Sequence, residues 1–593
     1  MVDQTRTRRL PRALLASVLI VASCGSSTPT ATPAATSSAP ASAAVASATP
    51  PPTRAPSAAP TDPFLGAVVI TVSNRLRVRS LPEVSDASIK YEPLLPLGTE
   101  LQVIGGPVSG SGYVWYEVTP VSLALSDGIA RGWVAMADKT GDPWIALAHL
   151  PIAGLQTAMS AIARAQADPA AANAAADSVA GFGLKLYREL FVTPADLHDE
   201  NVVYSPTSIA LALGMARLGA RGETGSQMDD VLAVADQAEL EAGLNALEQS
   251  LASREGAYRD DAGVGHELTL RLANASFAQQ DWSIERAYLD AIASVFGAGL
   301  NLLDYVADPE AARQVINAWV SQRTANRIPQ LLAPPDVSVN TRLYLVNAVY
   351  LKATWVLPFP KDMTAPRAFK RLDRSTVTVP TMRLSGGQEV PYLRREGWQA
   401  TELRYGGPDR SMPLAMMLIV PDNITAFEGA MTATFLRALG SDLTAERTRI
   451  VESVAYDGAG LDCGIYPYSV DLSMPRFSVE TRARLGRSLA AIGMPLAFDP
   501  GVADFTGIHV PEFDGDNIYI ANVIHQANID VDEAGTEAAA ATAVGMDTGG
   551  CTGPAPAERI ELRLDRPFLF AIRDIETGAI LFMGRVVDPS VRR

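Results

Sequence analysis

The chain has 593 residues, of which 48% are hydrophobic and 19% charged, and its formal net charge at pH 7 is −16. This length exceeds what one hydrophobic core ordinarily organises, so we expect several regions, and the apolar fraction is typical of folded domains. The negative charge argues against nucleic acid and anionic lipid as partners, because both are bound through clustered lysine and arginine.

The first 23 residues have the pattern of a secretory signal. Four arginines within residues 6–12 precede an apolar run at residues 13–22, which is too short to span a bilayer. The residues VASC, which end at Cys24, then resemble a bacterial lipobox. This resemblance implies cleavage before Cys24 and attachment of lipid to its thiol, which would anchor the protein to a membrane at the cell surface. An ordinary signal peptide, with a secreted product, is the alternative.

Residues 24–62 consist largely of Pro, Ala, Ser and Thr. Such a segment cannot bury enough apolar surface to offset the entropy lost on ordering, so we expect a disordered tether. In residues 63–150 the pattern changes to short apolar runs separated by Gly, Pro and Ser, which is the spacing of a small all-β barrel.

The order of motifs in residues 63–150 resembles a bacterial SH3-like domain. The motifs are LRVRSLP from Leu76, PLGTELQV from Pro96, VWYEV from Val114 and RGWV from Arg131. The resemblance implies a module that binds a cell-wall ligand or acts as an adaptor. Several aromatic residues are candidates for a groove, although in a domain of this size some must belong to the core. They are Tyr113, Trp115, Tyr116 and Trp133.

Residues 151–176 are rich in alanine and predict a helical connector. Beyond it, a series of motifs over residues 177–589 resembles the serpins, the serine protease inhibitors, in the order expected for that family. The motifs begin at Asn201 (NVVYSPTSIALALG), Leu272 (LANASFAQ), Ile316 (INAWVSQRTANRIPQLL), Leu345 (LVNAVYLKATWVLPF), Met474 (MPRFSVE), Ala503 (ADFTGI) and Arg566 (RPFLFAIRD). The resemblance implies an α+β serpin fold over residues 177–593, with three β-sheets, about nine helices and an exposed reactive-centre loop.

Residues 533–550, EAGTEAAAATAVGMDTGG, combine two properties that rarely occur together. If they formed a strand, the even-numbered side chains from Thr536 to Thr548 would be uncharged and mostly small, and Glu537 and Asp547 would lie on the other face. That uncharged face could enter a sheet without burying an unpaired charge. Ala and Gly are nevertheless poor strand formers, so the pattern predicts a segment that is first exposed and later inserted. An Ala-rich loop or a short helix capped by Thr536 is the alternative.

Within this stretch, VDEAGTEAAAAT at residues 531–542 resembles the hinge of the serpin reactive-centre loop. Gly535 would supply backbone freedom where the loop turns into the sheet, and Thr536 would be the first side chain to enter it. By the resemblance the hinge consists of Glu533, Gly535, Thr536, Glu537, Ala538, Ala539, Ala540, Ala541 and Thr542.

The register of the family places the cleaved bond between Gly549 and Gly550. The loop is several residues longer than is usual for serpins, so cleavage after Met546 or Thr548 remains an alternative. Apart from Asp547, residues 544–550 are small or uncharged, which favours an elastase-like or subtilisin-like target over a trypsin-like one.

The resemblance also places five residues where the main sheet of a serpin parts. From the residues alone, the alternatives are a helix cap, a core amide, a core aromatic and a buried neutral imidazole. The five residues are Ser205, Ser208, Asn347, Trp355 and His525.

Three cysteines occur, at Cys24, Cys463 and Cys551. If Cys24 carries lipid, the other two could form one disulfide outside the cytoplasm, and two free thiols are the alternative. A bond between Cys463 and Cys551 would hold the downstream part of the loop without restraining the upstream part that inserts.

The sequence contains no HExxH, GxSxG, P-loop or paired CxxC motif, so we expect no catalytic activity, no cofactor and no metal site. The serpin resemblance implies instead a monomer that traps a serine protease as an acyl-enzyme while the cleaved loop adds a strand to the main sheet. A non-inhibitory serpin-fold binding protein is the first alternative, and a cell-wall hydrolase is the second.

Overall fold

The structure is a computed structural model that describes residues 62–591, with gaps at residues 63, 74, 97, 122, 149–151, 193–198, 260–264, 388, 407–410, 457–463, 512–516 and 538–557. The expected signal at residues 1–23, Cys24 and nearly all of the tether at residues 24–62 lie outside the described residues. Cys463, Cys551 and the loop from residue 538 to residue 557 also lie outside them.

The N-terminal β-domain, residues 62–147, is a seven-stranded antiparallel sheet with its own hydrophobic core. Burial alternates along its strands, so that one face of each strand packs inward, as in Leu76 and Val78 of β2. Of the aromatic candidates, Trp115 and Tyr116 belong to the buried interior, whereas Tyr113 and Trp133 are half-buried. The strands are β1 (Val68–Thr71), β2 (Leu76–Arg79), β3 (Lys90–Leu95), β4 (Glu100–Gly110), β5 (Tyr113–Pro120), β6 (Gly132–Ala135) and β7 (Ile145–Leu147).

The connector differs from the helix expected over residues 151–176. Residues 152–168 form no helix and contain the short strand β8 (Gln156–Ala158), and helix α1 (Pro169–Tyr187) begins only after them. Asp168 caps that helix by accepting a hydrogen bond from the Ala170 amide at 2.9 Å, and proline is favoured in the first turn of a helix. The upstream residues instead pair with a sheet edge, so tertiary pairing overrides their helical composition.

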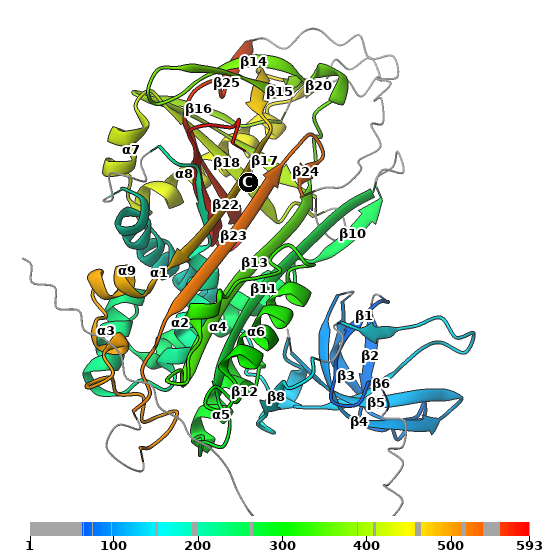
Figure 1. The fold of residues 1–593 in the computed structure, drawn as a ribbon. Coiled ribbons are helices and arrows are strands. Elements are labelled where there is room, and N and C mark those ends of the chain that lie inside the picture. Colours follow the sequence, from blue (N-terminus) through cyan, green and yellow to red (C-terminus); the bar gives the residue numbers. More distant parts are fainter. Residues whose placement is uncertain are drawn as a thin grey trace, which may run out of the picture. The chain divides into compact units, whose positions relative to one another are not determined.

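The part of the chain that follows the connector forms a second, larger domain, which we call the large domain. Its main sheet has eight strands (Figure 1). Its order is β22-β23-β24-β13-β11-β12-β8, and β10 pairs with β11. The long central strands β11 and β13 are antiparallel, and β13 and β23 are parallel. Their bounds are β22 (Phe477–Arg484), β23 (Val523–Val531), β24 (Gly535–Thr536), β13 (Leu343–Thr354), β11 (Gly265–Gln279), β12 (Leu300–Leu303) and β10 (Gly256–Arg259).

Two further sheets complete the large domain, together with the two-stranded pair β19 (Ala455–Tyr456) and β20 (Gly464–Ile465). The four-stranded sheet consists of β14 (Ala365–Lys370), β15 (Thr376–Gly387), β21 (Ser469–Pro475) and β25 (Arg559–Arg563). The six-stranded sheet consists of β16 (Tyr392–Arg395), β17 (Trp398–Tyr405), β18 (Leu414–Pro421), β26 (Phe568–Asp574), β27 (Ile580–Val586) and β9 (Val202–Tyr204). Strand β18 is buried along its whole length, which explains its continuous apolar run LAMMLIVP.

Nine α-helices lie within the described residues. None of these helices combines the length and the apolarity that crossing a membrane requires. Helix α2 is buried on every side because it packs against strands β11 and β13 of the main sheet and against β27. After α1, the helices are α2 (Pro206–Arg217), α3 (Gly222–Leu232), α4 (Gln237–Ala252), α5 (Arg286–Phe296), α6 (Pro309–Arg323), α7 (Ile424–Ala430), α8 (Ala433–Glu452) and α9 (Gly486–Ala491).

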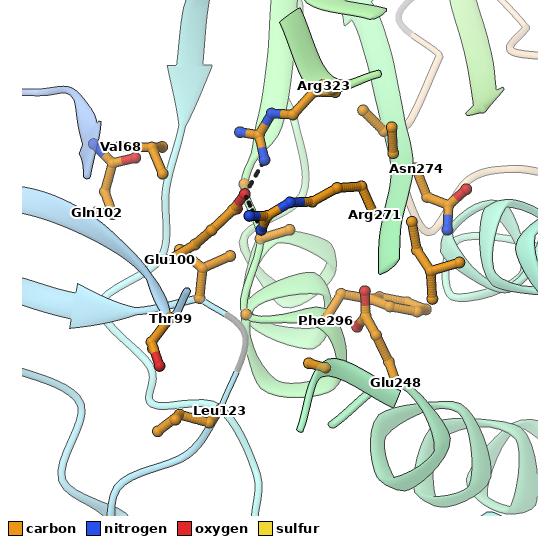
Figure 2. Close-up of a pocket in the computed structure, with 18 of the residues that line it drawn as sticks. Val68, Thr99, Glu100, Gln102, Leu123, Glu248, Arg271, Asn274, Phe296 and Arg323 are labelled. Atoms are coloured by element: carbon orange, nitrogen blue, oxygen red, sulfur yellow. Dashed lines mark hydrogen bonds and ion pairs between the residues drawn. The ribbon is translucent and has the colours of Figure 1, made fainter. Parts of the chain in front are cut away.

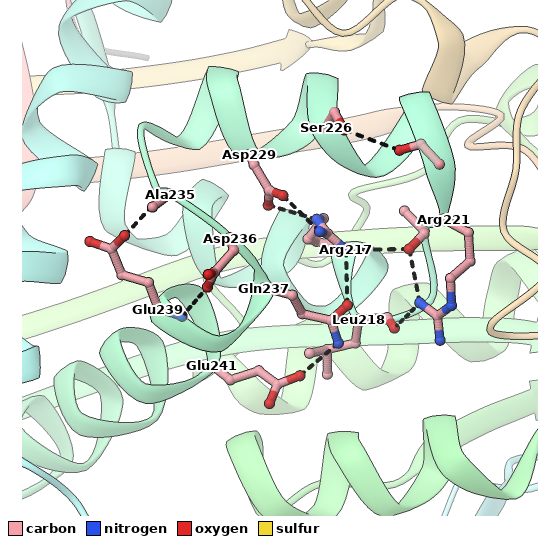
Figure 3. Close-up of polar contacts among 12 residues, drawn as sticks. Arg217, Leu218, Arg221, Ser226, Asp229, Ala235, Asp236, Gln237, Glu239 and Glu241 are labelled. Carbon is pink, nitrogen blue, oxygen red and sulfur yellow. Dashed lines mark hydrogen bonds and ion pairs between the residues drawn. The ribbon is translucent and has the colours of Figure 1, made fainter.

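A polar cluster fixes the C-terminal end of α2 (Figure 3). The Arg217 guanidinium donates one hydrogen bond to each carboxylate oxygen of Asp229 on α3, both at 2.7 Å, and another to Gln237 on α4 at 3.0 Å. The bidentate geometry ties three consecutive helices together. Helix α2 is therefore held at its far end, and its N-terminal residues are presented to the underside of the main sheet.

Candidate functional site

The boundary between strands β13 and β23 changes character along its length. At its lower end the two strands pair directly, from Leu345 opposite Val523 to Val349 opposite Ala527. At its upper end β24 lies between them, with Thr536 paired to both Ala353 and Val531. The chain that follows β23 has therefore already begun a new strand in the main sheet.

Gly535 makes the turn into this sheet. Its φ is 156°, and a Cβ at this position would lie 2.0 Å from the carbonyl oxygen of Ala353. No other residue fits so close to the neighbouring backbone. The close approach allows β24 to pair with β13 immediately after the turn.

Thr536 packs against an aromatic pair at the top of the sheet. Its side chain is buried, with 1% of the residue exposed, and its hydroxyl lies 2.6 Å from the hydroxyl of Tyr405. The Tyr405 ring stacks on Trp355 with ring centroids 4.3 Å apart. The Trp355 indole donates to the Asp532 carbonyl at 3.0 Å, so the same aromatic pair holds the chain on both sides of the turn.

Glu533 anchors the start of the hinge. Its carboxylate accepts hydrogen bonds from Arg476, the closest nitrogen contact being 2.5 Å, and from the Thr364 hydroxyl. Burial acts to raise the pKa of Glu533, but the hydrogen bonds from Arg476 and Thr364 outweigh it and hold that pKa below its ordinary value. The carboxylate therefore remains ionised, and it fixes one end of the turn to the body of the domain.

Glu537 is the last hinge residue that the structure describes. It pairs with Arg327, and its amide donates to the Asp530 carbonyl at 2.8 Å. Burial raises the pKa of its carboxyl to about 7, against the opposing effect of Arg327. The other hinge residues and all the scissile-bond candidates lie outside the described residues. They are Ala538, Ala539, Ala540, Ala541, Thr542, Met546, Thr548, Gly549 and Gly550.

A second polar cluster, which we call the buried network, lies beneath the lower end of the same boundary. His525 on β23 is joined to Asn347 on β13 by a hydrogen bond between Nδ1 and Oδ1. The Asn347 amide donates to the Ser208 hydroxyl at 2.6 Å and to the Asn274 side chain on β11 at 2.7 Å. The network therefore links three neighbouring strands to helix α2.

The protonation state of His525 follows from its partners. Its Nε2 accepts a hydrogen bond from the Ser205 amide at 3.1 Å, so in the neutral ring the proton is on Nδ1 and is donated to Asn347. Burial lowers the pKa of His525 to about 3, which keeps the ring neutral. Ser205 also caps α2, because its hydroxyl accepts from the Ser208 amide at 3.2 Å.

The five residues expected where the sheet parts thus fall into two groups. Ser205, Ser208, Asn347 and His525 meet in the buried network, and Trp355 lies apart from them beside the hinge. Sequence reasoning missed Asn274, although this residue lies in the motif LANASFAQ that carried part of the resemblance. In the structure, Asn274, Asn347 and His525 stand opposite one another on three adjacent strands. It also missed Tyr405 and Arg476, which reach the hinge from distant parts of the chain.

The comparisons with known proteins match this arrangement. Residues 177–589 match the protein family described as Serpin (serine protease inhibitor). The chain belongs to the serpin family. The expected serpin fold, with several sheets and about nine helices, is confirmed. A family of inhibitors is consistent with the expectation that the chain is not an enzyme.

Among serpins, Iripin-8 of Ixodes ricinus is 33% identical over 407 residues, which are 68% of this chain and 91% of the relative. The leukocyte elastase inhibitor of Bos taurus is 32% identical over 402 residues, which are 68% of this chain and 97% of that inhibitor. The second of these relatives is, by its name, an inhibitor of leukocyte elastase.

Two solved structures resemble the same part of the chain. Serpin48 of the insect Tenebrio molitor has a TM-score of 0.52 and 26% identity, and the match covers 70% of this chain and 98% of Serpin48. Human thyroxine-binding globulin complexed with thyroxine has a TM-score of 0.56 and 25% identity, with 71% and 99% covered. The chain thus shares its fold both with Serpin48 and with a globulin that binds thyroxine.

Proposed function

We propose that this protein inhibits serine-type endopeptidases as a suicide substrate. The observation that carries the proposal is β24, a strand already started between β13 and β23 by a hinge whose inserting side chain is small and uncharged. A protease that cleaves the loop forms an acyl-enzyme, and the freed segment continues β24 down the main sheet. The tethered protease is carried several tens of Å, because about fourteen residues insert at roughly 3.3 Å each.

Insertion has to compete with hydrolysis of the acyl-enzyme. The strand that follows Thr536 replaces the direct pairing between Leu345 and Val523 and between Val349 and Ala527. It must also break the hydrogen bond between His525 and Asn347, which lie on opposite sides of the boundary. The small side chains of the hinge suit rapid entry, since they need no rearrangement of the helices beneath the sheet.

We favour elastase-like or subtilisin-like proteases as targets. Apart from Asp547, the residues around Met546 and Thr548 are uncharged and include no Arg or Lys, which supports this class because a trypsin-like enzyme requires Arg or Lys before the cleaved bond. The relationship to a leukocyte elastase inhibitor, 32% identical, supports it further.

A protease panel tests the proposal. The full chain is incubated with elastase, subtilisin, chymotrypsin and trypsin, and the products are examined for an SDS-resistant covalent adduct and for the new N-terminus. We expect an adduct with elastase or subtilisin, cleavage after residue 546, 548 or 549, and a large rise in the melting temperature of the cleaved chain. Cleavage without an adduct and without a rise in melting temperature would refute inhibition by insertion.

The second candidate function is that of a non-inhibitory binding protein. The resemblance to thyroxine-binding globulin favours it, because that serpin was solved with a small hormone bound. The same panel separates the two functions. A binding protein would be cleaved as an ordinary substrate and would give no covalent adduct with any of the four proteases.

For the N-terminal part we propose a lipid anchor at Cys24 and an SH3-like module that binds a cell-wall ligand. In the β-domain, the half-buried Tyr113 stacks on Trp144 with centroids 5.7 Å apart, and Lys139 lies over the Tyr113 ring at 5.3 Å. This aromatic surface supports ligand binding by stacking. Labelling with radioactive palmitate should be lost in Cys24→Ser, and sedimentation with cell walls should be weakened in Tyr113→Ala.

We further propose that Cys463 and Cys551 form a disulfide. Both are exported if the signal functions, and an oxidising compartment favours the bond. Peptide mapping by mass spectrometry without reductant should yield one cross-linked peptide that contains both cysteines. Two separate, alkylatable peptides would contradict the pairing.

A further inference from the structure

The N-terminal β-domain contacts the large domain through ion pairs and hydrogen bonds. Some of them reach strand β11 and helix α6, and others reach helix α4. The contact region surrounds a cavity of about 410 Å³, lined by Thr99, Glu100, Leu123 and Phe296 among others (Figure 2). Close apolar packing therefore does not hold the two together throughout. The contacts that do hold them are specific hydrogen bonds and ion pairs.

Glu100, the first residue of β4, joins the β-domain to the strand and helix beside the opening. Its carboxylate accepts a hydrogen bond from Arg323 at the end of α6 at 2.8 Å, and it lies 3.7 Å from the Arg271 guanidinium on β11. Figure 2 shows the Glu100 side chain reaching toward both guanidinium groups. Its side chain is 12% exposed, so water screens these ion pairs only partly.

The connector makes a second contact with the same side of the sheet. Strand β8 is antiparallel to β12, from Leu300 opposite Ala158 to Leu302 opposite Gln156. The Thr157 hydroxyl also donates to the Asn301 side chain at 3.0 Å. Strands β8, β12 and β11 and helix α6 thus carry the β-domain and the connector on one side of the boundary where β24 begins.

A third set of contacts attaches the same region to helix α4, which packs on α1 and α2 in the helical layer. Arg164 of the connector donates to the Val121 carbonyl of the β-domain at 2.8 Å and to Glu248 on α4 at 2.6 Å. The Ala124 amide of the β-domain donates to Gln249 on α4 at 3.1 Å. Arg164 is 5% exposed, so removing either partner would leave a buried polar group unpaired.

Opening of the main sheet opposes the contacts to β11, β12 and α6 and the contacts to α4. Entry of one more strand separates β13 from β23 by about 4.8 Å. If β11, β12 and α6 move together with β13, they shift relative to α4 in the helical layer. The β-domain holds α6 and β11 through Glu100, and it holds α4 through Ala124 and Arg164. Hydrogen bonds on one of the two sides have to break before the sheet opens fully.

From this geometry we infer that the N-terminal β-domain and its connector act as a brake on opening of the main sheet. The inference rests on the loop insertion proposed above. A brake of this kind lengthens the lifetime of the uncleaved, uninserted chain. It also makes the rate of insertion dependent on what the β-domain binds, because a ligand that shifts the β-domain alters its hold on α6 or α4.

The test uses the full chain and a synthetic peptide with the sequence of residues 538–548, which continues β24 without competing with Thr536. The peptide enters the sheet only when the sheet opens, and native gel electrophoresis resolves the resulting complex. We expect the peptide to enter Glu100→Gln and Gln249→Ala on the order of five-fold faster than the unmodified chain. The two variants break contacts to different elements, and both leave the core intact.

Glu117→Gln is the matched control, because Glu117 pairs with Arg131 inside the β-domain at 3.5 Å and, among the residues that the structure describes, makes no ion pair to the large domain. Its rate of peptide entry should equal that of the unmodified chain. A double-mutant cycle with Glu100→Gln and Arg323→Gln should be non-additive, since the two substitutions remove the same hydrogen bond. Equal rates for Glu100→Gln, Gln249→Ala and the unmodified chain would overturn the inference.

The outcomes also separate this inference from the proposed function. If the unmodified chain takes up no peptide and its cleaved form gains no thermal stability, loop insertion itself is wrong. If the unmodified chain takes up peptide and is stabilised by cleavage, but Glu100→Gln and Gln249→Ala behave identically to it, the inhibitor function stands and the brake is refuted.

Discussion

The two ends of the boundary between β13 and β23 are built differently. At the upper end, β24 separates the two strands. There the Tyr405 side chain contacts Thr536, and the Trp355 side chain contacts the Asp532 carbonyl. At the lower end, the strands pair directly over a buried network that includes His525 and Asn347. At the upper end the inserting strand has therefore already begun, and at the lower end β13 and β23 are still paired with each other.

This difference indicates the direction of insertion. A new strand that grows from β24 meets backbone groups already exposed to it, whereas entry from below would first have to break paired backbone hydrogen bonds. The lower end therefore sets the energy barrier to separating β13 from β23, and the upper end determines which side chains can enter the sheet. The following substitutions separate those two roles.

The largest effect is expected for Thr536→Arg at the upper end. The arginine charge would be buried against Tyr405 and Trp355 without a partner, which costs several kcal/mol, and β24 would be expelled. Covalent adduct should fall at least about ten-fold, with cleaved, non-inserted chain accumulating instead, as measured on SDS gels. Thr536→Ser keeps the hydroxyl and should retain adduct formation; an undiminished adduct in Thr536→Arg would contradict the role of this position.

At the lower end, His525→Ala should destabilise the uncleaved chain by about 2–4 kcal/mol, because Asn347 and the Ser205 amide lose their buried partner. Urea unfolding measures the loss, and entry of the 538–548 peptide should become faster. His509→Ala is a control at another buried histidine, which stacks on Trp282 at 4.6 Å outside the main sheet. It should lower stability without accelerating peptide entry.

The same histidine gives the lower end a pH dependence. The folded-state pKa of His525 is about 3, below its ordinary value of 6.5, so the unfolded chain binds a proton at pH values where the folded chain does not. Its contribution to stability is fully present above pH 6.5 and is lost as the pH falls toward 3. The unfolding free energy should be about 2 kcal/mol lower at pH 5 than at pH 8 through this group alone. The difference in unfolding free energy between the unmodified chain and His525→Gln, measured as a function of pH, isolates the contribution of His525. Parallel pH profiles for the two chains would exclude that contribution.

The smallest effect is expected for Tyr405→Phe, which removes one hydroxyl from the upper end. Thr536 would lose its 2.6 Å partner while staying buried, which costs about 1 kcal/mol. Peptide entry at the lower end should be unchanged, while the melting temperature should drop slightly. Tyr392→Phe provides the comparison, because the Tyr392 hydroxyl donates to Gln399 at 2.8 Å in the same six-stranded sheet as Tyr405 but, within the part of the chain that the structure describes, forms no hydrogen bond with Thr536.

Much of this arrangement could be predicted from the sequence because serpin motifs occur in order along it. The even-odd alternation puts Thr536 on the inserting face, and Thr536 is buried in the structure. The same alternation puts Glu537 on the opposite face, but it could not supply its partner Arg327, which lies more than two hundred residues earlier. Partners of that kind depend on strand order, which a single sequence does not specify.

The connector shows the limit most clearly. Its alanines favour a helix when they are considered alone, but whether residues 156–158 form a strand depends on a free edge of β12 that exists only after the large domain has folded. Arg164 is equally unpredictable, since its four hydrogen bonds reach the β-domain, helix α4 and the end of α5.

Strand β8 has one more consequence, for encounters between molecules. Without it, the outermost strand of the main sheet would be β12, and its unsatisfied amides and carbonyls could template a strand from a neighbouring copy. The chain covers that edge with its own three-residue segment, in which Gln156 and Thr157 are exposed polar residues and little backbone remains to be extended. At the β12 edge, strand β8 therefore protects the protein from edge-to-edge aggregation, while the interior of the sheet stays available to its own loop.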